Sequence, residues 1–446
     1  MRNALEINQI RKGTPMESIH DLAPEIQKRL SEIGRNLNKR GVSKPEAKSM
    51  SALMRGLIQT RQVMVMPVVR VLGEKIAPKK TWERLTRNMA KEGLSERLLS
   101  AHVEQQVGSI REMPYCIIDL SDIQKRYAEK MEGLGRVRDG SKKGEKKEPV
   151  IGNGYYWLNA VMADKKEICP VHGEIYSVDK EGHEQESENK KILRIIDHVY
   201  GINSEAIFVI DRGGDRITLE RPLLEGKKRF IIRGQGQRSL RLHMDSEKLT
   251  NIGEIARRTR TTRRYVSERG KKVQFDVGIR KIYLGKETLW LVVSRQADKK
   301  EGLSWYLTDI KGTKKQVMDT VMEAYGLRWR IEEYHRQIKQ DFKLEEICIR
   351  KYSAIKTLGV LVMMAAAFCA RLPYALVIKL MAVTNQLPHK RLSDIPNFPY
   401  YKIESAVATV LNATARRPRL PLKIRKRNYF QWNCAWVSSK NGGWPV

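Results

Sequence analysis

The chain lacks any hydrophobic run long enough to cross a membrane. Its most apolar stretch, Thr357–Ala370, spans about fourteen residues and is followed by Arg371 and Lys379, whereas a transmembrane helix needs roughly 20 apolar residues. The first residues, MRNALEINQIRKG, also lack the apolar segment of a secretory signal peptide. We therefore predict that 357–370 is a buried core helix, and we expect no membrane partner.

Cysteine is scarce as well. The five cysteines are odd in number and scattered, which is typical of a protein from a reducing compartment and not of a disulfide-stapled secreted domain. Cys169 and His172 have the spacing of half a zinc site, but no second pair accompanies them. We expect no zinc there.

Acidic residues are few relative to basic ones. The chain has 51 Asp and Glu against 84 Lys and Arg, a net charge of +33. Such an excess repels itself in the folded state, and a polyanion relieves the repulsion by releasing counterions. Nucleic acid is therefore the predicted partner. The 41% hydrophobic content is ordinary for a folded protein of two to four domains.

The first part of the chain, residues 1–110, is predicted to be helical. Between 81 and 106 the apolar residues recur at helical spacing among charges, and a Gly-Leu-Ser break divides them. This pattern suits a DNA-binding helix pair, and it equally suits a plain helical bundle with a basic face. We predict a helical N-terminal DNA-binding region.

Residues 111–238 change to strand-like patterns. Pro114–Leu120 is a short apolar run that predicts a buried strand ending at Asp119, followed by a charged loop. Two strand-like runs (154–162 and 173–178), a helix (188–200) and two apolar strands (206–211 and 229–233) follow. Continuous apolar strands are typical of a sheet covered on both faces. This order predicts an α/β fold with an RNase H-like core.

The chain then becomes β-rich and basic over 239–310, with predicted strands at 272–277, 281–284, 289–294 and 304–308. The segment 256–265, ARRTRTTRRY, holds five arginines in ten residues. We predict an inserted β-rich subdomain there, a second part of the catalytic core at 311–372, and a C-terminal region at 373–446 that contacts DNA or a second copy. Its segment 416–427, RRPRLPLKIRKR, predicts a loose basic tail.

The segment 325–340, YGLRWRIEEYHRQIKQ, carries the most chemical information. On a single helix at about 100° per residue, one polar stripe holds Tyr325, Arg328, Glu332, Arg336 and Lys339. A neighbouring apolar stripe holds Leu327, Ile331, Tyr334 and Ile338. Glu333 points away from the polar stripe. By itself this pattern also fits a surface helix with i,i+4 ion pairs.

Two aspartates change that interpretation, since Asp119 and Asp211 each follow an apolar strand. An aspartate in that place is usually a turn or capping residue. Two of them on neighbouring strands, with Glu332 on a basic helix, instead match phosphodiester chemistry with two divalent ions about 3.5–4 Å apart. Mg²⁺ prefers hard oxygen ligands, so these carboxylates suffice without His or Cys.

The spacing Tyr325-x2-Arg328-x3-Glu332-x6-Lys339 resembles in full the tyrosine–arginine–glutamate–lysine signature of the insertion-sequence-four family of bacterial DDE transposases. The segments 119–122, DLSD, and 209–213, VIDRG, resemble the two aspartate motifs of that family. The resemblance covers roughly 113–372, and neither end of the chain carries a matching motif.

This resemblance implies an RNase H-like domain in which Asp119, Asp211 and Glu332 are catalytic and bind two Mg²⁺ or Mn²⁺ ions. It implies phosphate contacts from Tyr325, Arg328 and Lys339, and we add Arg336 from the same stripe. Relatives stack a flipped base on an aromatic residue of the insertion. Trp305 is the best match, and a plain core tryptophan is the alternative. Asp122 could replace Asp119 as the ligand, but Asp119 directly ends the apolar run.

The expected function is cut-and-paste DNA transposition at terminal inverted repeats. Water nicks the element end, and the freed 3′-OH attacks the opposite strand, forming a hairpin, or target DNA. The family implies a homodimer in a synaptic complex in the bacterial cytoplasm, at the nucleoid. Two alternatives stay open: an RNase H-like nuclease or resolvase without joining activity, and a catalytically inactive DNA-binding repressor derived from a transposase.

Overall fold

Apolar strand sequences in the middle of the chain pair into one mixed sheet in the computed structural model. The structure describes residues 18–143, 149–165, 167–179, 182, 186–235, 238–268, 271–297, 302–386 and 400–414. All of them belong to one compact unit, and the predicted basic tail at 416–427 lies outside the described residues.

The sheet holds twelve strands within the described part of the chain. Along its main path the order is β2-β3-β1-β5-β6-β12-β11-β10-β7-β8, with β4 also paired to β3 and β9 to β10. The strands are β1 (Tyr115–Gln124), β2 (Gly135–Lys143), β3 (Pro149–Ala163), β4 (Ile168–Tyr176), β5 (Ile207–Ile210), β6 (Phe230–Arg233), β7 (Ser239–Arg241), β8 (Leu249–Asn251), β9 (Thr261–Glu268), β10 (Lys271–Leu284), β11 (Glu287–Gln296) and β12 (Ser304–Thr308).

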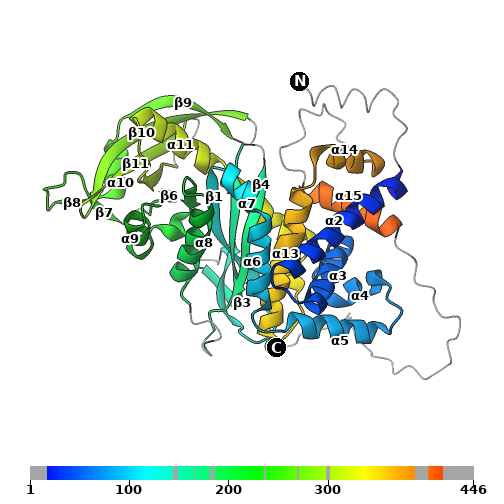
Figure 1. Cartoon of the computed structure of the whole chain (residues 1–446). Helices are drawn as coiled ribbons and strands as arrows, with labels where there is room; N and C mark the ends of the chain where they lie inside the picture. Colours follow the sequence, from blue (N-terminus) through cyan, green and yellow to red (C-terminus); the bar gives the residue numbers. More distant parts are fainter. Residues whose placement is uncertain are drawn as a thin grey trace, which may run out of the picture. The chain divides into compact units, whose positions relative to one another are not determined.

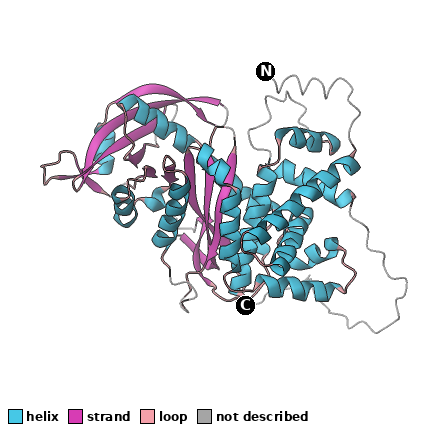
Figure 2. Ribbon diagram, in the orientation of Figure 1, coloured by secondary structure: helices cyan, strands magenta, loops and turns pink. Residues whose placement is uncertain are grey.

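Helices cover both faces of this sheet (Figures 1 and 2). They are α2 (Ile19–Lys39), α3 (Lys44–Thr60), α4 (Val65–Leu72), α5 (Pro78–Met89), α6 (Leu94–Gln105), α7 (Val107–Glu112), α8 (Glu188–Ile202), α9 (Ile217–Glu225), α10 (Ile252–Arg258), α11 (Lys314–Gly326), α12 (Trp329–Asp341), α13 (Tyr352–Ala370), α14 (Tyr374–Val383) and α15 (Tyr400–Ala413), with short 3-10 turns η1 (Arg212–Gly214) and η2 (Leu344–Glu346).

Alternate residues of β1 face two different cores, as the period of a strand requires. Ile117 packs in the core shared with α12 and α13, whereas Ile118 packs in the core shared with α8 and α9. Both faces are therefore apolar, which explains why β1 and β5 are predicted by continuous apolar runs.

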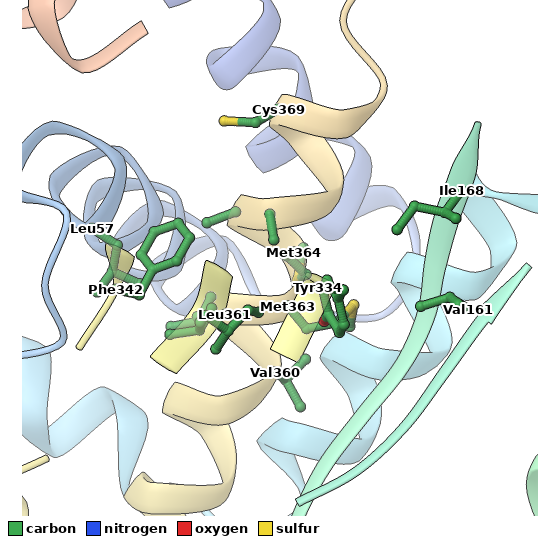
Figure 3. Packing of buried hydrophobic residues seen from close by; sticks show 14 of the residues in the cluster. Leu57, Val161, Ile168, Tyr334, Phe342, Val360, Leu361, Met363, Met364 and Cys369 are labelled. Atoms are coloured by element: carbon green, nitrogen blue, oxygen red, sulfur yellow. The ribbon is translucent and has the colours of Figure 1, made fainter. Parts of the chain in front are cut away.

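The predicted helix at 357–370 is confirmed and begins five residues earlier, as α13 (Tyr352–Ala370). The prediction that this run is too short to cross a membrane is wrong, because α13 is long and apolar enough by length and composition; however, 78% of its apolar window is buried inside the fold. It contacts β4 on one side and α3 and α6 on the other. Figure 3 shows Met363 and Met364 of α13 among side chains of α3 (Leu57) and the strands (Val161, Ile168). The surrounding protein fills the place that lipid would take.

Three details of the predicted core are wrong. The strand β1 does not end at Asp119 but continues to Gln124, because the fifteen-residue β3 pairs with it from Tyr115 to Gln124. Part of the predicted charged loop is strand β2, which pairs with the start of β3. The turn between the strands predicted at 154–162 and 173–178 is shorter than expected, because Pro170 lies inside β4, where a register shift lets proline join a strand without breaking it.

The basic β-rich region at 239–310 continues the sheet. Its last strand, β12, pairs with β6 of the core, and β11 and β10 follow it outward. The segment ARRTRTTRRY spans the end of α10 and the start of β9, and the two strands predicted at 272–277 and 281–284 are one strand, β10.

Candidate active site

Three parallel strands bring the candidate site together in one row. Ile118 of β1 is in register with Ile210 of β5, and Ile210 with Ile232 of β6. The next residues along these strands are Asp119, Asp211 and Arg233. Because parallel strands in register place successive residues side by side, the two aspartates lie at the same level of the sheet.

The segment 325–340 is not one helix, contrary to the sequence prediction. Tyr325 belongs to α11, which ends at Gly326, and α12 begins at Trp329. Between them the amides of Arg330 and Ile331 bond three residues back, to Leu327 and Arg328. The predicted apolar stripe is confirmed: Leu327, Ile331, Tyr334 and Ile338 are all buried. The break turns Arg328 and Tyr325 toward the ends of the strands.

The guanidinium of Arg328 joins the three predicted carboxylates. Its Nη1 lies 2.8 Å from Glu332 Oε1 and 3.6 Å from Asp119 Oδ2, and its Nη2 donates to Asp211 Oδ2 at 2.9 Å. The structure therefore brings Asp119, Asp211 and Glu332 around one cation, from two strands and one helix.

The hydroxyl of Tyr325 forms a second junction beside the first. It donates to Asp211 Oδ1 at 3.0 Å, and it accepts from Arg328 Nε at 3.3 Å and Arg233 Nη1 at 3.2 Å. Tyr306 of β12 packs on the Tyr325 ring, with centroids 4.5 Å apart. Both oxygens of Asp211 are thus held by hydrogen bonds.

Burial and neighbouring charges shift the pKa values of Asp119 and Asp211 in opposite directions. Burial raises the pKa of Asp119 from 3.8 to about 6; Arg328 opposes this, and the charges of Asp211 and Glu332 add to it. Burial also acts on Asp211, but Arg328 and the hydrogen bonds from Arg212 and Tyr325 hold its pKa below 3.8. Negative charge is concentrated enough here that the site favours a cation.

The remaining charged residues of the predicted stripe and the zinc-like pair have partners outside this cluster. Lys339 pairs with Asp122 Oδ1 at 3.2 Å and with Glu345, so the two aspartates of the 119–122 motif have separate partners. Arg336 pairs with Glu333 and is half exposed, turned away from Arg328. Cys169 donates to Gln106 and His172 pairs with Glu174, so the zinc-like pair has separate partners too.

Trp305 is half-buried in β12 and packs in the core beside α8 and α10. A methyl group placed on Gly234 would lie 2.4 Å from its ring, so the indole rests directly on that backbone. Its Nε1 has no hydrogen-bond partner among the described residues. In this structure the ring has the environment of a core tryptophan.

Sequence reasoning missed Arg233, although a signal was present. Arg233 ends the third apolar strand just as Asp211 follows the second, so the rule applied to the aspartates selects it as well. It lies 3.9 Å from Asp211 Oδ1 and donates to Ser304 Oγ.

A buried ion cluster beside the turn that follows Asp211 was also not predicted from the sequence. Arg238 pairs with Asp215 and Glu220, whose side chains are 1% and 0% exposed. Asp215 also accepts from the amide of Gln235, whose side chain donates to the Arg212 carbonyl at 2.7 Å. These contacts fix the turn that directly follows Asp211. Asp215 ends the segment 211–215, DRGGD, and nothing in its spacing alone distinguishes it from a turn residue.

The donor set suits a hard divalent cation. Asp119, Asp211 and Glu332 offer only carboxylate oxygens, the ligands that Mg²⁺ and Mn²⁺ prefer, and they already enclose the cationic group of Arg328. Within the described residues, no three His, Cys, Asp or Glu side chains stand close enough to hold a metal as they are. The carboxylates are thus of the type that binds such an ion, and in this structure all three contact Arg328.

Comparison with known proteins gives one match and one negative result. The model of the transposase DDE domain matches residues 117–368, more than half of the chain. No curated protein matches the sequence. The matched range begins in β1, ends in α13 and includes both aspartates, Arg328 and Glu332. The chain belongs to the transposase DDE domain family, whose members act on DNA and typically use divalent metal ions.

Proposed function

We propose that the protein is the transposase of an insertion sequence, moving it by cut-and-paste at terminal inverted repeats. The observation that supports this most is the meeting of Asp119, Asp211 and Glu332 around a single cation. On the tyrosine–arginine–glutamate–lysine spacing, we further propose the insertion-sequence-four type. The strand order β3-β1-β5-β6, with β1, β5 and β6 parallel, supports an RNase H-like core.

In this proposal Asp119, Asp211 and Glu332 hold two Mg²⁺ or Mn²⁺ ions. When bound, such ions neutralise charge on the scissile phosphate and lower the pKa of the attacking water. The protein's part is to hold the carboxylates in place. Tyr325 and the turn fixed by Arg238 orient Asp211, and β3 supports Asp119 from the opposite strand.

The reaction is phosphoryl transfer without a protein–DNA covalent bond. Water attacks the phosphodiester at the element end, the bond to the 3′-oxygen breaks, and a 3′-OH is released. That hydroxyl then attacks a second phosphodiester, in the opposite strand or in target DNA, whose own bond to the 3′-oxygen breaks so that a new 3′-OH leaves. Arg328, Arg233 and Lys339 place cations next to the carboxylates, where guanidinium and ammonium groups can bind the DNA phosphates. We also propose that a homodimer assembles both ends.

The test is cleavage and joining of labelled element-end DNA in Mg²⁺, with the wild-type protein beside Glu332→Gln. The amide keeps the shape of the side chain but removes a charged ligand. We expect the wild type to nick and join, and the variant to bind DNA and do neither. Nicking without joining would instead indicate a nuclease, and binding without cutting by the wild type would indicate a repressor. Normal cutting by the variant would remove Glu332 from the site.

A further inference from the structure

The side chain of Arg328 holds the place that a metal ion needs. It is 12% exposed and contacts all three carboxylates. We infer that Arg328 is an autoinhibitory latch: in the DNA-free protein its guanidinium closes the carboxylates, and a DNA phosphate draws it away so that metal loads on bound DNA. This inference rests on the proposed function and adds its regulation.

Metal and guanidinium compete for the same oxygens. Arg328 Nη1 donates to Glu332 Oε1 and lies beside Asp119 Oδ2, and Nη2 donates to Asp211 Oδ2. The second oxygen of Asp211 is already bonded to the Tyr325 hydroxyl. An ion bound by the oxygens that Arg328 contacts must displace its guanidinium, and an ion bound next to them is repelled by its charge.

The latch can open without disturbing the fold. Arg328 precedes α12 at the break after α11, and the core residues around it, Leu327 and Ile331, face the other way. The Glu332 side chain is 53% exposed, so the contact between Arg328 and Glu332 is accessible to solvent. When Arg328 leaves, Asp211 keeps its bond to Tyr325.

A DNA phosphate is a suitable competitor for the latch. The guanidinium fork binds phosphate with two parallel hydrogen bonds, as it binds carboxylate. The net charge of +33 brings DNA to the protein. Because coupling between two ligands is reciprocal, DNA then raises the affinity for metal and metal raises the affinity for DNA.

The first arm of the test uses Mn²⁺ alone and the full-length, DNA-free protein. The bound fraction is measured by electron paramagnetic resonance for wild type, Arg328→Gln and Arg328→Lys. We expect Arg328→Gln to bind Mn²⁺ about tenfold more tightly than wild type, within the range usual for coupled sites. Arg328→Lys keeps the charge without the fork and is expected to fall between them. Arg336→Gln is the matched control, since it removes the same charge from α12, which directly follows Arg328, at a position outside the cluster.

The second arm adds a short random-sequence DNA duplex. DNA is expected to raise the Mn²⁺ affinity of the wild type and to leave that of Arg328→Gln nearly unchanged. The Mn²⁺ bound by the DNA itself is measured in the complex of DNA with Asp119→Asn, and this amount is subtracted. Circular dichroism and thermal melting verify that each variant is folded before it is compared.

The outcomes separate the latch from the proposed function. If Asp119→Asn abolishes Mn²⁺ binding while Arg328→Gln binds no tighter than wild type, the metal site stands and the latch is wrong. If Arg336→Gln tightens binding as much as Arg328→Gln, the effect is net charge and the latch is again wrong. If Asp119→Asn leaves all Mn²⁺ binding intact, the proposed metal site itself fails.

Discussion

At the scale of single residues, Asp119 and Asp122 show how neighbours on one strand take different roles. Both lie in β1, three residues apart, and both have partly buried side chains. Asp119 faces Arg328 within the carboxylate cluster, whereas Asp122 pairs with Lys339 and accepts from Gln124. Because only Asp119 shares a partner with Asp211 and Glu332, only Asp119 is expected to reach the reacting phosphate.

Replacing these two aspartates in turn tests that distinction. We expect Asp119→Asn to lower the rate of DNA nicking by more than about a hundredfold, beyond the loss typical of a residue that only supports a metal ligand. Asp122→Asn keeps a polar partner for Lys339 and is expected to lower it less than about tenfold. Single-turnover nicking under matched Mg²⁺ measures both. The reverse ranking would show that Asp122 is the ligand.

At the scale of elements, β3 organises the site because it pairs with three strands. Its first residues, up to Gly154, pair with β2, and from Gly154 onward it lies between β1 on one side and β4 on the other. Gly154 stands where β1, β2 and β3 meet, and a methyl group there would lie 2.2 Å from the Ile123 carbonyl oxygen. That oxygen is backbone and cannot move without shifting β1.

Gly154→Ala is therefore expected to destabilise the protein by about 1–3 kcal/mol, the usual cost of overpacking a tight site. Gly201 in α8 is the matched control, since a methyl group there meets nothing within 4 Å. Gly201→Ala is expected to stabilise the protein by about 0.5–1 kcal/mol, because alanine favours a helix. Urea unfolding measures both, and equal effects would contradict the packing at Gly154.

The link between α6 and β4 predicts a pH dependence of stability. His102 is buried and its Nε2 lies 2.8 Å from the Pro170 carbonyl oxygen. Burial lowers the pKa of His102 from 6.5 to about 4, although the Pro170 bond opposes the shift. The unfolded chain therefore binds a proton that the folded chain does not between about pH 6.5 and 4. This contribution to stability is present above pH 6.5 and is lost as the pH falls.

From that shift we expect His102 to cost the folded state about 2 kcal/mol at pH 5 relative to pH 7. His102→Gln keeps a donor for Pro170 but does not titrate. The pH effects of all other acidic and basic groups therefore cancel when the free energies of unfolding of the two proteins are compared. The free energy of unfolding is measured for both proteins at the two pH values. A wild-type loss equal to that of the variant would show that His102 is not the titrating group.

At the scale of the whole molecule, the chain combines a strongly cationic composition with one extended sheet. The insertion strands continue the core sheet through β12, β11 and β10, so their basic residues are carried on the same framework as the carboxylates. Among the basic residues of this region, Arg257 and Arg260 are exposed, as is the aromatic Tyr265. The net charge of +33 belongs to the sequence as a whole and acts at long range.

This charge predicts that affinity for duplex DNA falls steeply with salt. If six to ten phosphates are contacted, the affinity drops about 10³- to 10⁵-fold between 50 and 200 mM salt. Fluorescence anisotropy over a NaCl series measures the slope, and Glu332→Gln is expected to show the same slope because it leaves the cations in place. An affinity independent of salt would contradict electrostatic binding to the DNA backbone.

The sequence by itself determined the local features that depend on near neighbours. Apolar runs located β5, β6 and β12 almost to the residue, and a 3.6-residue period located α8 and the buried stripe of Ile331, Tyr334 and Ile338. The charge excess indicated a polyanionic partner, and fixed spacing indicated a DDE transposase, which the family match supports. Except for the charge excess, which is a sum over the whole chain, each of these signals lies within a short stretch of sequence and can be recognised without tertiary structure.

Only the tertiary structure decided how distant segments meet. The length of β1 depends on its pairing with β3, and the segment predicted as one helix is divided between α11 and α12, with Tyr325 and Arg328 both bonded to Asp211. Arg233 joins the site because β6 is in register with β5, and Arg328 lies among carboxylates that are 117 residues or more away on the strands. Such contacts are set by register and packing across the sheet, and no local period in the sequence records them.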